Sequence, residues 1–241
     1  MDEKELKTST KQRVIIAIIA VLMLGSIIAG YAAIIMNGGK SSSTSDESKV
    51  DEAKIAEYQE AYNNVLAEFS ETTKEDYDQF IAHKSEIKAY NETSANENGL
   101  QTRDLEKGSG DKIDENSNYL AYYVGWCADE TIFDSSFDDN ENPTAFSKIL
   151  DASLGMIEGW NEGVKGMRLG GIREITIPGE LAYGESMEIC GGTNKPLKFI
   201  VMAKAKEDPL KSLAEKVDTA YMRLQYAQYG MDYDEMMNAG E

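Results

Sequence analysis

The sequence has few of the residues that most enzymes use for covalent or metal-based chemistry. Its 241 residues include one histidine, His83, and two cysteines. A histidine-based triad or a metal site with several histidines is therefore nearly excluded, and we expect no metal and no cofactor. The two cysteines are too few for a disulfide scaffold, and the four prolines are too few for a proline-rich spacer.

Basic residues are also scarce. The chain has 24 Lys and Arg against 43 Asp and Glu, which gives a formal net charge of -19. Proteins that bind nucleic acid need patches of Lys and Arg to neutralise phosphates, so we expect no nucleic-acid partner. The length suits one sizeable core with extensions better than two large domains.

One long stretch, residues 14–36, contains no charge and is almost entirely apolar. It is about as long as the roughly 20 residues that cross a bilayer. Four basic residues precede the run and one follows it closely: Lys4, Lys7, Lys11, Arg13 and Lys40. The positive-inside rule then places residues 1–13 in the cytoplasm and the rest of the chain outside. The run is longer than the core of a usual signal peptide, so we expect an uncleaved, single-pass anchor in the cell membrane.

The anchor is followed by a segment with helical periodicity. Residues 37–49, rich in Gly, Ser and Thr, predict a flexible linker, and residues 50–98 predict a helical arm. Its apolar residues recur every three or four positions, at Ile55, Tyr58, Tyr62, Val65 or Leu66, and Phe69. The run Thr72-Thr73-Lys74-Glu75 resembles a capping box and predicts a second helix, with residues 91–98 as a polar linker. Two interpretations are open: a hairpin packed on itself or on the main domain, or an arm that forms a homodimer or holds other polypeptides.

Residues 208–241 predict another helix at the far end of the chain. Apolar residues fall three and four apart at Leu210, Leu213, Val217, Tyr221 and Leu224. The tail from residue 231 onward is acidic and rich in methionine, which suits either a frayed end or an adaptable apolar contact surface.

Between these helical parts, residues 99–207 have the pattern of a small sheet domain. Strands are predicted at residues 100–105, 119–126, 172–177 and 197–205, where β-branched and aromatic residues gather. A single short helix is expected at residues 157–164. The fold class is therefore α+β.

Three short segments of this domain place an aromatic residue beside small or acidic ones. They are Phe133-Asp134-Ser135-Ser136, Met156-Ile157-Glu158-Gly159-Trp160 and Leu181-Ala182-Tyr183-Gly184. In this order and spacing they resemble the FKBP-type peptidyl-prolyl cis-trans isomerases, and the resemblance spans residues 99–207. It implies an antiparallel sheet curled around one short helix, with an apolar pocket that accepts proline-containing polypeptides.

The resemblance also implies a role for each pocket residue. Trp160 would form the floor under the proline ring, Tyr183 and the Ile157 N–H would bind substrate carbonyls, and Asp134 would lie at the rim. The remaining pocket residues would be Tyr123, Phe133, Phe146, Met156, Ala182, Ile189 and Phe199. Such a site needs few ionisable groups, because rotation about an X-Pro bond breaks no covalent bond and a dry pocket disfavours the planar, polar ground state.

The sequence departs from the family pattern at two places. The family often has a basic residue shortly after its Phe-Asp segment, paired with the Asp, whereas residues 137–141 carry three acids and no base. We therefore expect Asp134 to be less ionised or less firmly held. The loop after Tyr183 lacks the usual Ile-Pro-Pro-like turn, which leaves Ile189 as its apolar lip. Cys190 lies in this loop and Cys127 follows the strand of Tyr123, so a disulfide and two free thiols are both open.

Two functions follow from these features. The first is a membrane-anchored isomerase that assists the folding of exported proteins outside the cytoplasm. The alternative is a non-catalytic module of the same fold, whose helical arms hold unfolded polypeptides.

Overall fold

The computed structural model of the protein describes residues 51–238. The predicted cytoplasmic segment 1–13, anchor 14–36 and linker 37–49 lie outside the described residues. Within residues 51–238, no helix combines the length and the apolar character that a membrane crossing requires.

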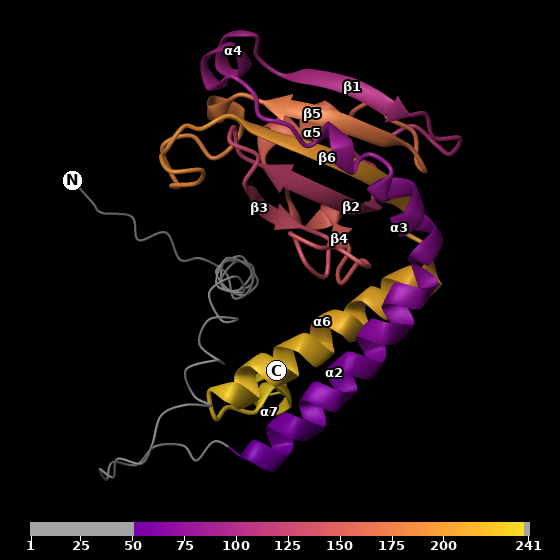
Figure 1. Cartoon of the computed structure of the whole chain (residues 1–241). Coiled ribbons are helices and arrows are strands. Elements are labelled where there is room, and N and C mark those ends of the chain that lie inside the picture. Colours follow the sequence, from indigo (N-terminus) through magenta and orange to yellow (C-terminus); the bar gives the residue numbers. More distant parts are fainter. Residues whose placement is uncertain (1–50, 239–241) are drawn as a thin grey trace, which may run out of the picture. The chain divides into compact units, whose positions relative to one another are not determined.

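An antiparallel sheet forms the centre of the fold (Figure 1). Its strands follow the order β1-β5-β6-β2-β3, and β4 pairs with β2. The strands are β1 (Gln101–Glu106), β2 (Tyr119–Trp126), β3 (Ile132–Ser135), β4 (Leu150–Asp151), β5 (Ile172–Ile177) and β6 (Leu197–Ala205). The predictions at 119–126, 172–177 and 197–205 are confirmed, and that at 100–105 is shifted by one residue. The short strands β3 and β4 were not predicted, because neither is long enough to show an alternating pattern.

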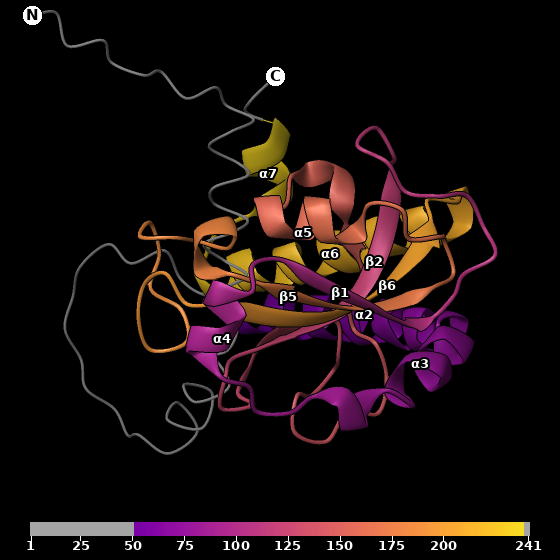
Figure 2. The ribbon, with the colours of Figure 1, turned by 90° about the horizontal axis from the view of Figure 1, so that it is seen from above.

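Each face of this sheet is covered by a different layer, so the fold has two cores. Every residue of β2 is buried, since this strand is central and both of its faces are covered. On one face, Tyr119, Ala121 and Tyr123 pack with the short helix α5 (Glu158–Val164). On the other, Leu120, Tyr122 and Val124 pack with the helical arm. We call these the α5 face and the arm face; Figure 2 shows α5 and α3 on opposite sides of the strands.

Helix α5 lies unusually close to the sheet because two glycines face β5. A Cβ atom at Gly159 would lie 2.2 Å from Ile177 Cγ2, and one at Gly163 would lie 2.5 Å from Ile175 Cγ2. Arg173 of β5 donates to the carbonyls of Gly163 and Lys165 at the end of the helix, over 2.9 and 3.1 Å. An isolated helix of seven residues is not stable in water, so this contact with β5 is what fixes α5 and the residues it carries.

The arm pairs the first described helix with the C-terminal one. Helix α2 (Glu52–Thr72) lies along α6 (Asp208–Gln228), with the rings of Tyr62 and Tyr221 5.8 Å apart (Figure 1). The short α7 (Tyr233–Asn238) returns against α6, where Arg223 pairs with Asp234. The apolar stripe of α2 is thus covered by α6, which the sequence did not indicate, while α3 (Lys74–Ile81) packs on the arm face of the sheet.

Two local predictions about the arm are wrong. The run at residues 72–75 forms no capping box: the hydroxyls of Thr72 and Thr73 donate to carbonyls of α2, at Glu68 and Phe69. The predicted linker at 91–98 contains helix α4 (Glu92–Glu97), because the Asn91 side chain accepts the Ser94 N–H and caps it. The remaining short elements are 3₁₀ turns: η1 (Lys84–Glu86), η2 (Ala152–Leu154) and η3 (Gly179–Leu181).

Candidate active site

Trp160 of α5 lies at the centre of an aromatic group on the α5 face. Its ring meets those of Tyr123 and Phe199 edge to face, at centroid distances of 5.7 and 5.3 Å. Its Nε1–H donates to the hydroxyl of Tyr119 over 3.0 Å, so the buried indole is fully satisfied. Trp160 has no exposed surface. A proline ring can therefore reach it only after the half-buried residues around it separate.

The Asp134 carboxylate at the end of β3 is held by three hydrogen bonds. Oδ2 accepts the Tyr123 hydroxyl over 2.5 Å, and Oδ1 accepts the Ser135 N–H over 2.9 Å and the Lys148 ammonium over 2.6 Å. The expectation that Asp134 is less firmly held is therefore wrong. Its basic partner comes from 14 residues along the chain, not from the acidic segment directly after it.

Two hydrogen-bond donors of this group have no acceptor among the residues that the structure describes. They are the hydroxyl of Tyr183 and the backbone N–H of Ile157, the residue that precedes α5. Burial, together with the charge of Asp134, raises the pKa of the phenols of Tyr123 and Tyr183. Both phenols therefore stay protonated near neutral pH, and that of Tyr183 is available to donate to a ligand.

The other predicted pocket residues divide between the two faces. Phe133 meets Phe199 edge to face at 5.5 Å, and Met156, Ala182 and Ile189 pack half-buried against the α5-face core. Phe146 is not among them. It is fully buried in the arm-face core, where its ring stacks on Tyr122 at 4.0 Å. The structure therefore brings together every predicted site residue except Phe146.

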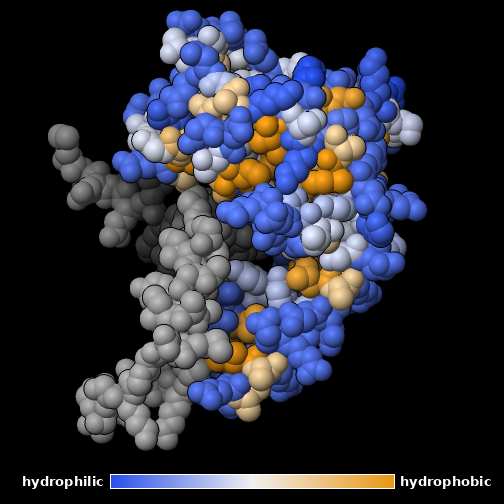
Figure 3. Space-filling model, in the orientation of Figure 1, coloured by the Kyte–Doolittle hydropathy of each residue, from blue (hydrophilic) through white to orange (hydrophobic). Residues whose placement is uncertain are grey.

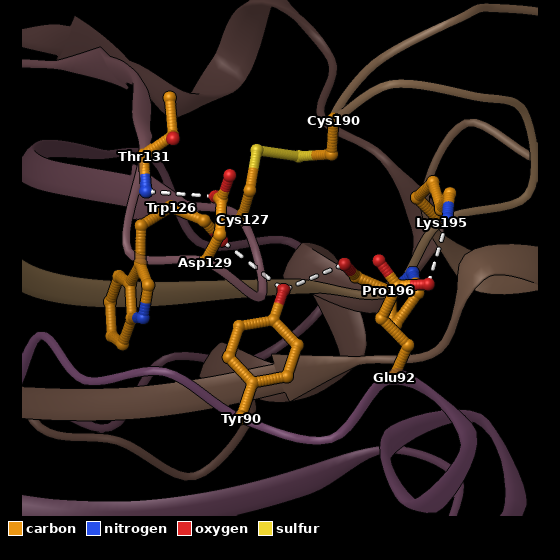
Figure 4. The surroundings of a disulfide bond; sticks show 9 residues. All are labelled: Tyr90, Glu92, Trp126, Cys127, Asp129, Thr131, Cys190, Lys195 and Pro196. Atoms are coloured by element: carbon orange, nitrogen blue, oxygen red, sulfur yellow. Dashed lines mark hydrogen bonds and ion pairs between the residues drawn. A yellow bond between two sulfur atoms is a disulfide. The ribbon is translucent and has the colours of Figure 1, made fainter.

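A disulfide joins Cys127 to Cys190, with the two Cα atoms 5.5 Å apart (Figure 4). It ties the loop after Tyr183 to the end of β2. Beside it, the Tyr90 hydroxyl contacts the carbonyls of Trp126 and Pro196, at 3.3 and 2.8 Å. The loop that lacks a proline turn is thus held in place by covalent and polar links.

Sequence reasoning missed Lys148 and Tyr119. Tyr119 could have been found, since residues 119, 121 and 123 alternate on one face of a strand. Nothing in the sequence marks Lys148, an isolated lysine before a two-residue strand.

A polar hollow of about 470 Å³ is lined in part by Tyr119 and does not include Trp160. In the stretch 51–238, no cluster of His, Cys, Asp or Glu could hold a metal ion.

In the described part of the chain, the fold thus places two hydrogen-bond donors without acceptors beside an aromatic group. The family model for FKBP-type peptidyl-prolyl cis-trans isomerase matches residues 110–204. The chain is 38% identical over 89 residues to an FK506-binding protein of Neisseria meningitidis serogroup B, a match covering 36% of this chain and 75% of that protein. It is 30% identical over 148 residues to the FKBP-type isomerase FkpA of Escherichia coli K12, covering 58% of this chain and 52% of that protein.

Among solved structures, that of AtFKBP13 matches with a TM-score of 0.37 and 28% identity, over 46% of this chain and 94% of that one. The chain belongs to the FKBP-type peptidyl-prolyl cis-trans isomerases. It is an enzyme that interconverts the cis and trans forms of X-Pro peptide bonds in polypeptides.

Proposed function

We propose that this isomerase is held in the cell membrane by residues 14–36 and assists the folding of exported proteins at the outer face. The observation that carries the proposal is the Cys127–Cys190 disulfide, because such bonds persist in oxidising compartments and are rare in the cytosol. The basic residues before the apolar run favour the same orientation.

We assign the floor of the substrate site to Trp160 and its walls to Tyr123, Phe133 and Phe199. A proline ring placed there loses contact with water, which favours the twisted amide, since the planar form is the more polar of the two. The barrier in question is large, about 18–20 kcal/mol for a peptide bond, and no bond has to be made or broken.

The polar groups of the site then fix the substrate main chain. The Tyr183 hydroxyl and the Ile157 N–H, both without acceptors in the described part of the chain, would donate to carbonyls on either side of the proline. Holding the two flanking carbonyls restrains the peptide while the amide between them turns. Asp134 would lie beside the turning carbonyl and interact with its changing dipole.

The topology can be tested with single reactive cysteines. Asn116 is exposed, and Asn116→Cys adds one thiol to the sheet domain while the native pair stays oxidised. A membrane-impermeant maleimide should label this variant in intact cells. The matched variant Ser9→Cys, ahead of the apolar run, should be labelled only after lysis.

Labelling of Ser9→Cys in intact cells, with Asn116→Cys protected, would reverse the orientation. Protection of both until lysis would place the whole protein in the cytoplasm and overturn the proposal.

A second activity, holding unfolded polypeptides, is favoured by one observation about the arm. Five large apolar side chains in the stretch 51–238 are exposed, and four of them are near the end of the arm: Tyr229, Met231, Met236 and Met237. Apolar surface is visible on the arm in Figure 3. Flexible methionines suit contact with varied apolar segments. Replacing the three methionines by glutamine should weaken suppression of aggregation of an unfolded protein; unchanged suppression would contradict this role.

A further inference from the structure

Lys148 lies beside Asp134, the carboxylate that we assign to the rim of the substrate site. Its ammonium lies 2.6 Å from Asp134 Oδ1 and 5.6 Å from the centre of the Tyr123 ring. Its side chain is 29% exposed, so it is partly shielded from water. Asp134 has no other cationic partner among the described residues. Lys148 is therefore the cation that balances the rim carboxylate, whose own side chain remains 39% exposed.

The backbone around Lys148 is anchored on both sides. Phe146 and Ile149 are buried in the arm-face core. Between them, the Ser147 N–H donates to Ser136 O over 2.9 Å, and the Ser147 hydroxyl donates to Phe137 O over 2.8 Å. Lys148 is therefore presented to the site by a fixed segment.

The same segment is tied to the strand that carries Tyr123. The Ser136 N–H donates to Tyr123 O over 2.8 Å, and the Tyr123 N–H donates to the Ser136 hydroxyl over 3.1 Å. The supports of Tyr123, Asp134 and Lys148 thus form one connected network, in which the lysine has little freedom to leave the carboxylate.

The arm contacts this network from behind. The rings of Tyr77 and Phe80 in α3 each meet Phe146 edge to face at 5.5 Å. The Ser70 hydroxyl of α2 donates to Phe146 O over 3.2 Å. Only one residue, Ser147, therefore separates the arm contact at Phe146 from the lysine whose ammonium reaches Asp134.

We propose that Lys148 is a positioning residue for isomerisation, which orients the Asp134 carboxylate and keeps it from competing for the Tyr183 hydroxyl. A carboxylate is a stronger acceptor than a peptide carbonyl. With its oxygens engaged by Lys148, Tyr123 and Ser135, Asp134 leaves the Tyr183 O–H free for substrate. The charge of Asp134 contributes to the raised pKa of Tyr183, so the two groups are near enough to interact. Without the ammonium, we expect the carboxylate to turn toward Tyr183 and withdraw that donor.

The test uses the full chain, the rate of cis-trans isomerisation of a proline peptide, and a double-mutant cycle. Lys148→Met keeps the apolar stem and removes the charge, and we expect kcat/KM to fall by roughly three- to tenfold, a modest figure because the pair is partly solvated. Lys148→Arg should keep kcat/KM within about twofold of the wild-type value, since its guanidinium also binds a carboxylate. In an Asp134→Asn background, Lys148→Met should have no further effect.

A matched control is available in Lys195. Its ion pair with Glu92 (Figure 4) spans 2.7 Å with side chains 29% and 40% exposed, against 29% and 39% for Lys148 and Asp134. Neither Lys195 nor Glu92 belongs to the α5-face core around Trp160. Lys195→Met should leave kcat/KM unchanged. Wild-type activity in Lys148→Met, effects that multiply with Asp134→Asn, or an equal loss in Lys195→Met would each overturn the proposal, and thermal unfolding of every variant verifies that it is folded.

Discussion

The two faces of the sheet use the same kinds of residue for different purposes. Tyr122 and Tyr123 are neighbours in β2, and each contacts another aromatic ring, Phe146 and Trp160 respectively, yet they belong to different cores. Tyr123 on the α5 face bonds Asp134 through its hydroxyl. Tyr122 on the arm face is wholly buried against Phe146, and its hydroxyl finds no partner among the described residues.

The difference arises from what covers each face. On the arm face, α3 and the ends of α2 and α6 bury aromatic rings completely, which favours stability. On the α5 face, one short helix and a disulfide-bound loop leave Phe133, Met156, Ile157 and Tyr183 half-buried. Half-buried apolar side chains contribute less to the free energy of folding than fully buried ones, and we expect their exposed surface to contact a substrate. The arm therefore forms part of the buried core of the enzyme, because its residues share one hydrophobic cluster with the sheet.

The largest effect expected from this comparison is on stability. Phe146→Ala should reduce the free energy of unfolding by about 3–5 kcal/mol, since it leaves a cavity within a closed aromatic cluster. Phe133→Ala, on the α5 face, should cost about half as much, because less of its surface is removed from water. Urea denaturation of both variants, monitored by tryptophan fluorescence, gives the two free energies of unfolding.

The same two variants should rank in the opposite order in activity. Phe133→Ala should lower kcat/KM at temperatures where Phe146→Ala is still folded and more active. Equal stability losses, or the larger loss in Phe133→Ala, would show that the arm face does not contribute more to stability than the α5 face.

Much of the sheet could be predicted because its signals are local. Strand β2 is a continuous run of apolar and aromatic residues, and β5 and β6 are rich in β-branched and other apolar residues. The order and spacing of the three motifs located Trp160, Asp134 and Tyr183 in one domain. Phe146 could not be assigned to a face, because it lies in a loop with no alternating neighbours to indicate a direction.

Other features depend on contacts between distant parts of the chain. The apolar stripe of α2 fixes no partner by itself, and the partner, α6, follows after the whole sheet domain. The ion pair of Lys148 with Asp134 likewise depends on how the chain returns from β3 to β4, over a loop of acidic and polar residues. Phe137 lies in the same segment, and its edge-to-face contact with Phe80, 5.8 Å between ring centres, could not be predicted from the sequence either.

A smaller effect is expected when a single hydroxyl is removed from the α5 face. Tyr183→Phe deletes a donor that has no acceptor in the described residues, so folding should be unaffected. A neutral hydrogen bond contributes about 0.5–1.5 kcal/mol, and about 1.4 kcal/mol is a factor of ten in rate. We expect kcat/KM for a proline peptide to fall a few-fold to tenfold. Wild-type kinetics in this variant would remove Tyr183 from the site.

The smallest effect is expected for the matching change on the arm face. Tyr122→Phe removes a hydroxyl that is fully buried and unpaired in the described part of the chain, and burial raises its pKa above the usual value. A buried hydroxyl without a partner costs free energy, so its loss should leave stability unchanged or raise it by up to about 1 kcal/mol.

The nearby Thr73 makes this result informative. Its own hydroxyl donates to Phe69 O over 2.8 Å, so its proton is already engaged, although its oxygen could still accept from Tyr122. A loss of more than about 1 kcal/mol in Tyr122→Phe would mean that this bond forms in solution. In that case the arm face would contain a polar link between the sheet and the α2–α3 junction. No change in stability, together with wild-type kcat/KM, would leave apolar packing as the main support of this face.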